Sequence, residues 1–383
     1  MTCCAPSTWI DRRIGDSSEN IVLDKLLKDL CNEDIVLLGE GARHGEGRTV
    51  KFKTRILTGL VETCGFNAVF VESGVYDMTA YTQAHNPSRD QLANAIGGLW
   101  SNAQQSQEWI TYLHESARSG RLHIVGLDDQ LSATSFYAQK RLATDLTAYL
   151  NPSDRAECRA RISHHINWKY SSDLPYTRGV QTLLDECLQK IEHTIPQTDP
   201  FQGPSDEANA LFAENLRRLI SRNFLNDQTA RFNVRDLSMF HNLVWHRSRL
   251  PEDTKIIVWS ANVHVAKTLA DVPGWEARIP LGAHLKSNFD ADISAIGFTA
   301  YSGSYLNISS NQEQELAAPP QRSLEALIRD ADDSVLYLTS KELEATGAIA
   351  SRVITTEFIA SEWQNLFDGL VIFDMQKAYQ PIE

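Results

Sequence analysis

The 383-residue sequence lacks the features that mark membrane proteins, secreted proteins and nucleic-acid-binding proteins. No run approaches the roughly 18 to 20 apolar residues of a membrane helix, and the first six residues lack a basic segment followed by an apolar one. We therefore expect no membrane partner and a cytoplasmic location. The formal net charge of -13 disfavours nucleic acid, which binds surfaces rich in Lys and Arg. These absences leave a small-molecule substrate as the expected partner.

Short motifs with known chemistry are missing as well. The six cysteines are scattered, and none belongs to a Cys-x-x-Cys pair typical of zinc or redox sites. We expect free thiols, with Cys64 and Cys187 on apolar helical faces as small core residues. The Gly-x-Ser-x-Gly elbow of serine hydrolases is absent, and so is the Gly-x-x-x-x-Gly-Lys-Ser/Thr loop that binds phosphates.

What is present is an alternation of strand and helix patterns. Segments with helical periodicity separate short apolar runs in the first third of the chain, at about 49–64, 76–84 and 105–118. The strand-like runs are at 35–38, 68–71, 122–127, 255–259, 292–298, 334–338 and 369–373. This order predicts an α/β fold with a mainly parallel central sheet flanked by helices.

The strand patterns stop between about 131 and 250, where helical ones replace them. No linker marks an independent second domain, so we predict a single domain of residues 1–383 with a large helical insertion at 131–250. An insertion at this point of the chain commonly forms a lid over the sheet edge. A purely structural buttress is the alternative.

Polar residues follow the first of these strand-like runs. Four glycines lie within the nine residues 39–47, and this turn also contains Glu40 and His44. Glycines let the backbone turn tightly and approach a ligand, and a carboxylate four residues from an imidazole can orient it as a general base. The alternative is a Gly-rich surface turn with an exposed histidine.

Two further runs end in carboxylates. Glu72 closes an apolar strand, where an unpaired buried charge would cost several kcal/mol, so it must form an ion pair, bind a cation or serve the chemistry. The structural alternative is an ion pair of Glu72 with Arg43, Arg48 or Lys53. The same argument applies to Asp128, for which capping of a helix is the structural alternative.

Asn262 and His264 follow the apolar run that ends at Trp259. In an open parallel sheet the carboxyl ends of the strands share one edge, and active sites assemble there. Asn262 is therefore expected to donate to a substrate oxygen, and His264 to act as a second acid or base. The alternative is a helix-capping asparagine and a packed histidine.

The order and spacing of these residues resemble the erythromycin esterase family. The resemblance rests on eight pieces between about 30 and 300, which are Gly39-Glu40 with His44-Gly45, Lys53, Glu72, Gly126-Leu127-Asp128, Arg235-Asp236 with Met239, Asn242 and Trp245, Trp259, Asn262 with His264, and Ile296-Gly297-Phe298. It implies a hydrolase without a covalent acyl-enzyme, in which His44 is the general base. It also implies that Glu40 and Glu72 orient this base or the water, and that His264 polarises or binds the substrate.

The chain also departs from the family pattern at three positions. Three residues separate Glu40 from His44, where the family usually has two, and Arg48 stands where a glutamate is usual. Ala261 replaces one histidine of the site. Arg43 and Arg48 could instead prepare the site for an anionic substrate.

The resulting prediction is an enzyme that hydrolyses an ester or lactone of a bulky natural product, with no required cofactor. One alternative is a cyclase, dehydratase or acyl transferase of natural-product biosynthesis that uses the same site. The other is a metal- or haem-binding protein, or a divalent metal dependence, with ligands from His44, Glu40, Glu72 and His264. The predicted catalytic residues are His44, Glu40, Glu72 and His264, and the predicted substrate-binding residues are Arg43, Arg48, Lys53, Asp128, Arg235 and Asn262.

Overall fold

The computed structural model describes residues 17–41, 44–167, 169–195, 204–307, 310–331 and 333–382. The chain divides into two compact units. The first unit comprises Met1–Phe70, Leu99–His123 and Arg247–Glu383, and the second comprises Val71–Gly98 and Ile124–His246. Within the described ranges, every helix is too short or too polar to cross a bilayer.

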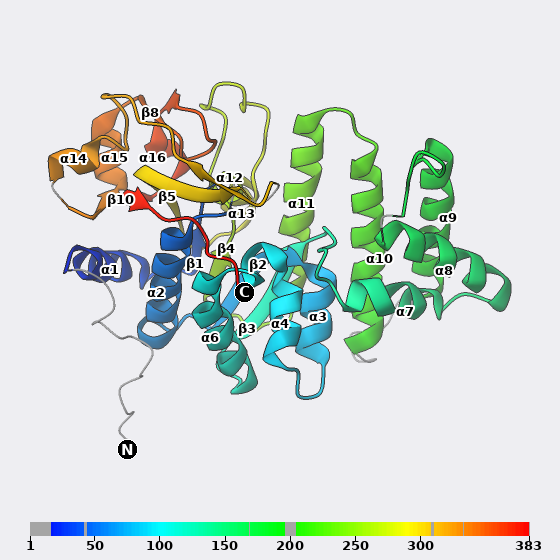
Figure 1. Cartoon of the computed structure of the whole chain (residues 1–383). Coiled ribbons are helices and arrows are strands. Elements are labelled where there is room, and N and C mark those ends of the chain that lie inside the picture. The colour runs from blue at the N-terminus through cyan, green and yellow to red at the C-terminus, as the bar shows by residue number, and fades with distance from the viewer. Residues whose placement is uncertain are drawn as a thin grey trace, which may run out of the picture. The chain divides into compact units, whose positions relative to one another are not determined.

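The sheet of the first unit has the strand order β4-β1-β5-β10-β7 (Figure 1). Strands β4, β1, β5 and β10 are parallel, and β7 runs antiparallel to β10. Their apolar side chains are buried on both faces, as expected for parallel strands between helical layers. The strands are β1 (Ile35–Leu38), β4 (Ile256–Trp259), β5 (Ile293–Asn307), β7 (Val335–Thr339) and β10 (Gly369–Gln376).

Helices cover both faces of this sheet (Figure 1). One layer contains α1 (Ser17–Leu30) and α2 (Gly47–Cys64), and the other contains α14 (Leu327–Ala331), α15 (Ser340–Thr346) and α16 (Trp363–Leu366). Helix α2 ends at Gly65, whose φ of 77° is the left-handed conformation that glycine adopts without strain. The remaining elements of the unit are α5 (Gly98–Ser101), the 3-10 helix Gln104–Ser106, α6 (Gln107–Arg118), α12 (Asn262–Val265), α13 (Leu281–Asn288), β6 (Gln312–Glu315), β8 (Ile349–Ser351) and β9 (Ile359–Ser361).

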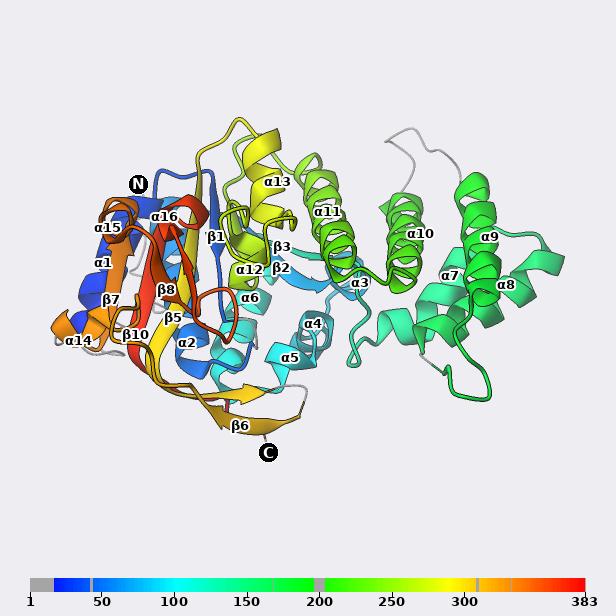
Figure 2. The same ribbon diagram turned by 90° about the horizontal axis from the view of Figure 1, so that it is seen from above.

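The second unit contains most of β2 (Ala68–Gly74) and β3 (His123–Asp128), which are neighbours, and is otherwise helical. The side chain of Asn151 caps α8 by accepting from two backbone N–H groups, and that of Thr177 caps α9 by accepting from one, so each helix begins where a side-chain acceptor is available. Helices α9, α10 and α11 lie in one row (Figure 2). The helices are α3 (Val75–Gln83), α4 (Arg89–Ile96), α7 (Ala143–Thr147), α8 (Pro152–Ile166), α9 (Arg178–Thr194), α10 (Pro204–Asn223) and α11 (Gln228–Arg247).

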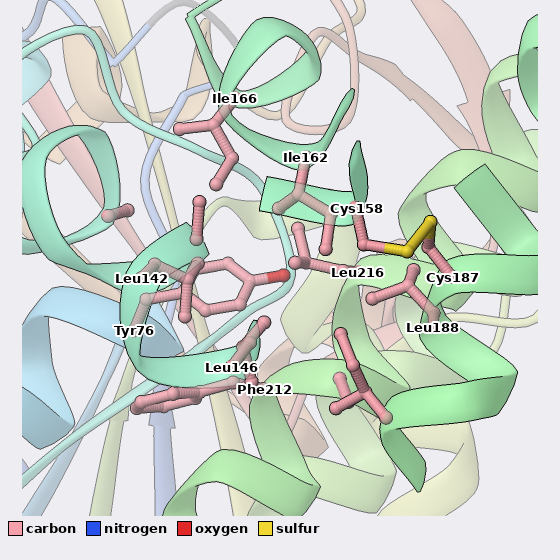
Figure 3. Packing of buried hydrophobic residues seen from close by; sticks show 14 of the residues in the cluster. Tyr76, Leu142, Leu146, Cys158, Ile162, Ile166, Cys187, Leu188, Phe212 and Leu216 are labelled. Atoms are coloured by element: carbon pink, nitrogen blue, oxygen red, sulfur yellow. A yellow bond between two sulfur atoms is a disulfide. The ribbon is translucent and has the colours of Figure 1, made fainter. Parts of the chain in front are cut away.

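A separate hydrophobic cluster stabilises this helical unit (Figure 3). Side chains such as Leu146, Ile162 and Leu216 are nearly inaccessible to solvent and face one another from α7, α8 and α10. Burying a side chain of this size stabilises the fold by about 1.5–3 kcal/mol. The disulfide Cys158–Cys187 joins α8 to α9 beside the cluster.

The prediction of free thiols is wrong for four of the six cysteines. Cys31 pairs with Cys64 at a Cα–Cα distance of 4.8 Å, and Cys158 pairs with Cys187 at 5.4 Å. The partners are 33 and 29 residues apart and meet because their helices pack together. No local spacing signals such a pair. Cys3 and Cys4 lie outside the described residues.

The predicted α/β fold with a mainly parallel sheet flanked by helices is confirmed. Each predicted strand is present, most with bounds within about two residues, whereas β5 extends nine residues beyond the predicted end. The polar strand β6 and the short pair β8 and β9 have no strong apolar pattern and were not predicted. The segment predicted as an insertion is helical and belongs to the second unit, together with α3 and α4. Its role as a lid stays a prediction.

Candidate active site

The turn after β1 is the first part of the site. Gly39 donates to the carbonyl of Ile296, and a Cβ atom at Gly39 would lie 2.1 Å from Oδ1 of Asn262. Asn262 N in turn donates to the carbonyl of Glu40 at 2.7 Å. Glycine is therefore required at position 39, because the segment after β4 approaches the turn after β1 so closely.

Asn262 holds three segments of the first unit together. Its Nδ2 donates to the carbonyls of Phe298 and Val353, each at 2.7 Å, and its Oδ1 accepts from Phe298 N at 3.0 Å. An amide has two donor hydrogens, so both are engaged with the backbone. The structure thus gives Asn262 a positioning role, and its predicted contact with substrate stays a prediction.

His44 and Glu40 form the central pair. Nδ1 of His44 lies 2.6 Å from Oε1 of Glu40, and the imidazole is 15 % exposed whereas the carboxylate is buried. Because an ionised carboxylate only accepts hydrogen bonds, Nδ1 is the donor and Nε2 of the neutral ring is left as an acceptor. His44 has a φ of 54°, a left-handed conformation that is uncommon for a residue other than glycine and often found at functional sites.

Glu40 has two further partners that come from distant parts of the first unit. Lys53 Nζ donates to Oε2 at 2.9 Å, and Trp100 Nε1 donates to Oε1 at 2.9 Å. Burial by itself would raise the pKa of Glu40, but the Lys53 ammonium and the hydrogen bond from His44 outweigh it, so the pKa lies below its usual value. Glu40 is therefore ionised over the neutral range and can orient His44.

Lys53 is completely buried on α2. Its ammonium lies 4.0 Å from the ring centroid of Trp259, and that ring stacks on Trp109 at 4.5 Å. A cation over an indole face gains about 2 kcal/mol when it is desolvated, which offsets part of the cost of burying Lys53. The structure places Lys53 against Glu40, and its predicted contact with substrate stays a prediction.

Backbone hydrogen bonds fix the rest of the turn. Gly45 accepts from Leu306 N and Tyr379 N, both at 3.0 Å, and Gly47 N donates to the carbonyl of Lys377 at 2.7 Å. A Cβ at Gly45 would lie 1.9 Å from the Leu306 carbonyl oxygen, so this position also needs glycine. Strand β5 and the segment after β10 thus hold the turn that contains His44.

Glu46 is a polar residue of this turn that the sequence analysis did not select. It precedes α2, and its Oε2 accepts from Gly41 N at 3.3 Å and from Thr49 Oγ1 at 3.1 Å. Burial raises the pKa of Glu46, and the nearby charge of Glu40 raises it further. The only sequence signal was its place two residues after His44.

Of the remaining predicted residues in this unit, Arg48 and His264 are placed clearly. Arg48 Nε donates to Glu19 at 3.1 Å, and its Nη1 forms an ion pair with Asp374, so its guanidinium is engaged within the fold. His264 is buried on α12, directly after β4, the strand adjacent to β1. Its contact with substrate stays a prediction. Arg43 lies outside the described residues.

The second unit contains a group of ion pairs at the carboxyl ends of β2 and β3. Arg235 Nη2 donates to Glu72 Oε1 and to Asp128 Oδ2, each at 2.6 Å. Arg235 lies on α11, 163 residues from Glu72, and is a partner that the structural alternative for Glu72 did not name. The predicted role of Glu72 in catalysis, and those of Asp128 and Arg235 in substrate binding, stay predictions.

The two adjacent aspartates of this unit differ in their proton affinity. Burial would raise the pKa of Asp128, but the Arg235 guanidinium lowers it below its usual value. Burial raises the pKa of Asp129 to about 6, although Arg222 donates to it at 2.8 Å. The difference arises because Arg235 lies closer to Asp128 than to its neighbour, and the charge of Asp128 itself disfavours ionisation of Asp129.

Within the described part of the chain, no three His, Cys, Asp or Glu side chains are grouped so that they could hold a metal ion. The metal- or haem-binding alternative stays a prediction, and elemental analysis is its test.

The family model described as erythromycin esterase matches residues 61–375. The chain belongs to the erythromycin esterase family. Within this family, the curated relative "Putative hydrolase YbfO" of Bacillus subtilis (strain 168) is 25 % identical over 363 residues, which cover 86 % of this chain and 80 % of YbfO. Membership of this family supports a hydrolase.

Solved structures share the fold of this erythromycin esterase family member. A succinoglycan biosynthesis protein has a TM-score of 0.72 at 16 % identity and covers 94 % of this chain and 92 % of its own. A mutant of the erythromycin esterase EreC in its open conformation has a TM-score of 0.65 at 17 % identity and covers 94 % of both chains. At these identities the likeness shows the fold alone.

Proposed function

We propose that the chain hydrolyses an ester or lactone of a bulky natural product, with His44 as the general base that activates water. The observation that carries this proposal is the 2.6 Å hydrogen bond between Glu40 and Nδ1 of His44, in a turn that leaves Nε2 available. Family membership and the hydrolase relative YbfO support the reaction class.

The proton path follows from the tautomer of His44. Water gives a proton to Nε2, the resulting hydroxide attacks the ester carbonyl, and the carboxylate of Glu40 stabilises the imidazolium through Nδ1. Because Glu40 is buried and ion-paired with Lys53, it holds the ring in one orientation and stays ionised while the ring gains its proton. A positioned base of this kind contributes about 100- to 10,000-fold to the rate.

The fixed turn supports this assignment. A general base must be held near the proton that it removes, and small displacements of a catalytic group reduce the rate strongly. His44 adopts its left-handed conformation between Gly41, whose carbonyl accepts from His44 N at 2.9 Å, and Gly45, which is tied to β5. We infer that this conformation is maintained because it aims Nε2 at the water.

The test compares His44→Gln with the control His123→Gln. His123 is an exposed histidine of the same unit. We expect His44→Gln to lower kcat by at least about 100-fold with an unchanged melting temperature, and His123→Gln to leave kcat unchanged. Turnover in water labelled with oxygen-18 should place one label in the acid product. Normal turnover by a folded His44→Gln protein would refute the assigned base. A product without label would instead indicate a cyclase, dehydratase or acyl transferase.

A further inference from the structure

The second unit contains a cavity of about 530 Å³. It is bordered by α3 and α4, which lie side by side (Figure 1), and by the start of the π-helical segment Ala138–Leu142. Sites for small molecules in proteins have volumes of about 300–1,000 Å³, so this cavity has the size of a ligand site. All residues of its wall belong to the second unit, whereas the turn that contains His44 belongs to the first.

Small side chains on α3 keep this space open. Ala80 and Ala84 are four residues apart and lie on the same side of α3 and its C-cap as Asp77 and Tyr81, and all four contribute to the wall. Both alanines are partly exposed, since their side chains end at Cβ and do not fill the cavity. A second cavity of about 260 Å³ has both alanines in its wall, so the open space continues along this helix.

Three aromatic side chains, Tyr81, Phe136 and Tyr137, contribute to the wall of the larger cavity. Phe136 is 64 % exposed, although phenylalanine gains free energy when it leaves water. The Tyr137 side chain is held in place, because its hydroxyl donates to Asp145 Oδ2 at 3.1 Å and its ring lies 5.8 Å from that of Phe212. A ligand with an aromatic ring would gain ring contacts here and would shield Phe136 from water.

Asp77 provides a negative charge in the wall and is only 8 % exposed. Its carboxylate accepts from Tyr137 N at 2.7 Å, from Ala138 N at 3.2 Å and from the hydroxyl of Ser135. These three donors are neutral, so they cap the segment that follows but leave the charge without a cation. Among the described residues, no lysine, arginine or histidine pairs with Asp77. Buried carboxylates in proteins normally have a cationic partner.

The other charged residues of the wall are Asp90 and Arg141. Each has a partner, since Asp90 lies 3.9 Å from Arg89 and Arg141 lies 3.4 Å from Asp145. Within the described wall, the charge of Asp77 is therefore the one that no cation offsets. A carboxylate beside aromatic rings attracts an organic cation, because the faces of the rings are negative as well.

We propose that the second unit binds an organic cation with an aromatic ring in this cavity. The ammonium group of the ligand faces Asp77, and its ring packs against Phe136 and Tyr137. This site goes beyond the proposed hydrolysis, because the residues that form it are not those of the His44 turn. Its test therefore needs no turnover.

The probes are three naphthalene compounds of similar size, namely the cation 2-(2-naphthyl)ethylammonium, the neutral 2-(2-naphthyl)ethanol and the anion 2-naphthylacetate. Calorimetry with the full chain measures their affinities in about 0.15 M salt, where the screening length of about 8 Å suppresses the field of distant charges. We expect the cation to bind on the order of 10-fold more tightly than the alcohol, and the anion to bind most weakly. Equal affinities for cation and alcohol, or tighter binding of the anion, would overturn the proposal.

Ala80→Leu tests the place of binding. Its added carbon atoms occupy the space that the ring needs, so the affinities for cation and alcohol should both fall by at least about 10-fold. Ala156→Leu is the matched control, because Ala156 is an exposed alanine of α8 in the same unit, and it should bind both compounds like the wild type. Wild-type binding by a folded Ala80→Leu protein would show that the ligand lies elsewhere.

Asp77→Asn tests the charge. We expect the affinity for the cation to fall to that for the alcohol, while binding of the alcohol is unchanged; an unchanged preference for the cation would refute the role of Asp77. Because Asp77 also caps the segment 138–142, this variant could unfold, and a crystal structure of the wild type with the cation then decides. The ammonium group should lie beside the Asp77 carboxylate, and a cation bound at any other position would overturn the proposal.

Discussion

The carboxylate of Glu40 accepts hydrogen bonds from three side chains that are 4, 13 and 60 residues away in the sequence. Two of them, Lys53 and Trp100, are buried. The negative charge is stabilised by these partners even though it lies in a medium of low polarity. At the scale of single residues, the orientation of the His44 ring therefore depends on the side chains that hold Glu40 in place.

At this scale we predict that Lys53→Met destabilises the protein and impairs catalysis. Methionine preserves most of the buried volume but leaves the Glu40 charge without its counterion, which costs about 3–5 kcal/mol. The pKa of Glu40 should rise, and kcat should fall because a protonated carboxyl group orients His44 poorly. Urea unfolding and steady-state kinetics are the measurements.

Lys51→Met is the control for this prediction, because Lys51 is an exposed residue on the same helix. It should change the free energy of unfolding by less than about 0.5 kcal/mol. A Lys53→Met protein as stable and as active as Lys51→Met would show that the ion pair with Glu40 contributes nothing.

Among the helices and strands, α2 begins within the turn of the site and ends at a disulfide. The residues before its first turn contain His44 and Glu46, its second turn contains Lys53, and its last residue is Cys64, paired with Cys31 after α1. The helices of the second unit are joined in a similar way by Cys158–Cys187, which links α8 and α9. Packing between helices, and not helix propensity alone, brings these residues together.

We predict that the double variant Cys158→Ala, Cys187→Ala lowers the free energy of unfolding by about 2–4 kcal/mol. The bond closes a loop of 29 residues, and a crosslink of this length restricts the unfolded chain by about that amount. Thermal melts in the absence and presence of a reducing agent provide the measurement. Reduction should lower the melting temperature of the wild type more than that of the variant, and equal shifts would argue against a stabilising bond.

Taken as a whole, the molecule carries 49 acidic and 36 basic residues and a net charge of -13. A field of this sign attracts cations and repels anions, and salt reduces both effects. Arg48, one of the two arginines expected to prepare the site for an anion, pairs with Glu19 and Asp374. We therefore expect the field of the whole chain to determine which charged substrates are favoured.

The prediction is that kcat/KM for a cationic ester exceeds that for its neutral isostere at low salt. The ratio should fall on the order of 10-fold between about 0.01 M and about 1 M salt, as the screening length drops from about 30 Å to about 3 Å. Kinetics with cationic, neutral and anionic esters of equal size test it. Preference for the anionic ester at low salt would instead support an anion site at Arg43 and Arg48.

The sequence alone determined the seven apolar strands, the helices α2, α3 and α6, and the pair at the centre of the site. Apolar runs such as 35–38 and 256–259 are short, continuous and buried on both faces, so a short stretch of sequence is enough to predict each strand. Glu40 and His44 are only four residues apart in a Gly-rich turn, so their contact is a short-range one. Local information was sufficient in each of these cases.

Only the tertiary structure decided which groups surround that pair and how the other charged residues are paired. Trp100 reaches Glu40 across 60 residues, Arg235 reaches Glu72 across 163, and Asn262 binds the backbone of β5. The cysteine pairs and the contacts of Glu46 with Gly41 and Thr49 were likewise missed. Such contacts depend on how packed helices and strands bring distant side chains together, and many distant partners fit the same local pattern until the packing selects one.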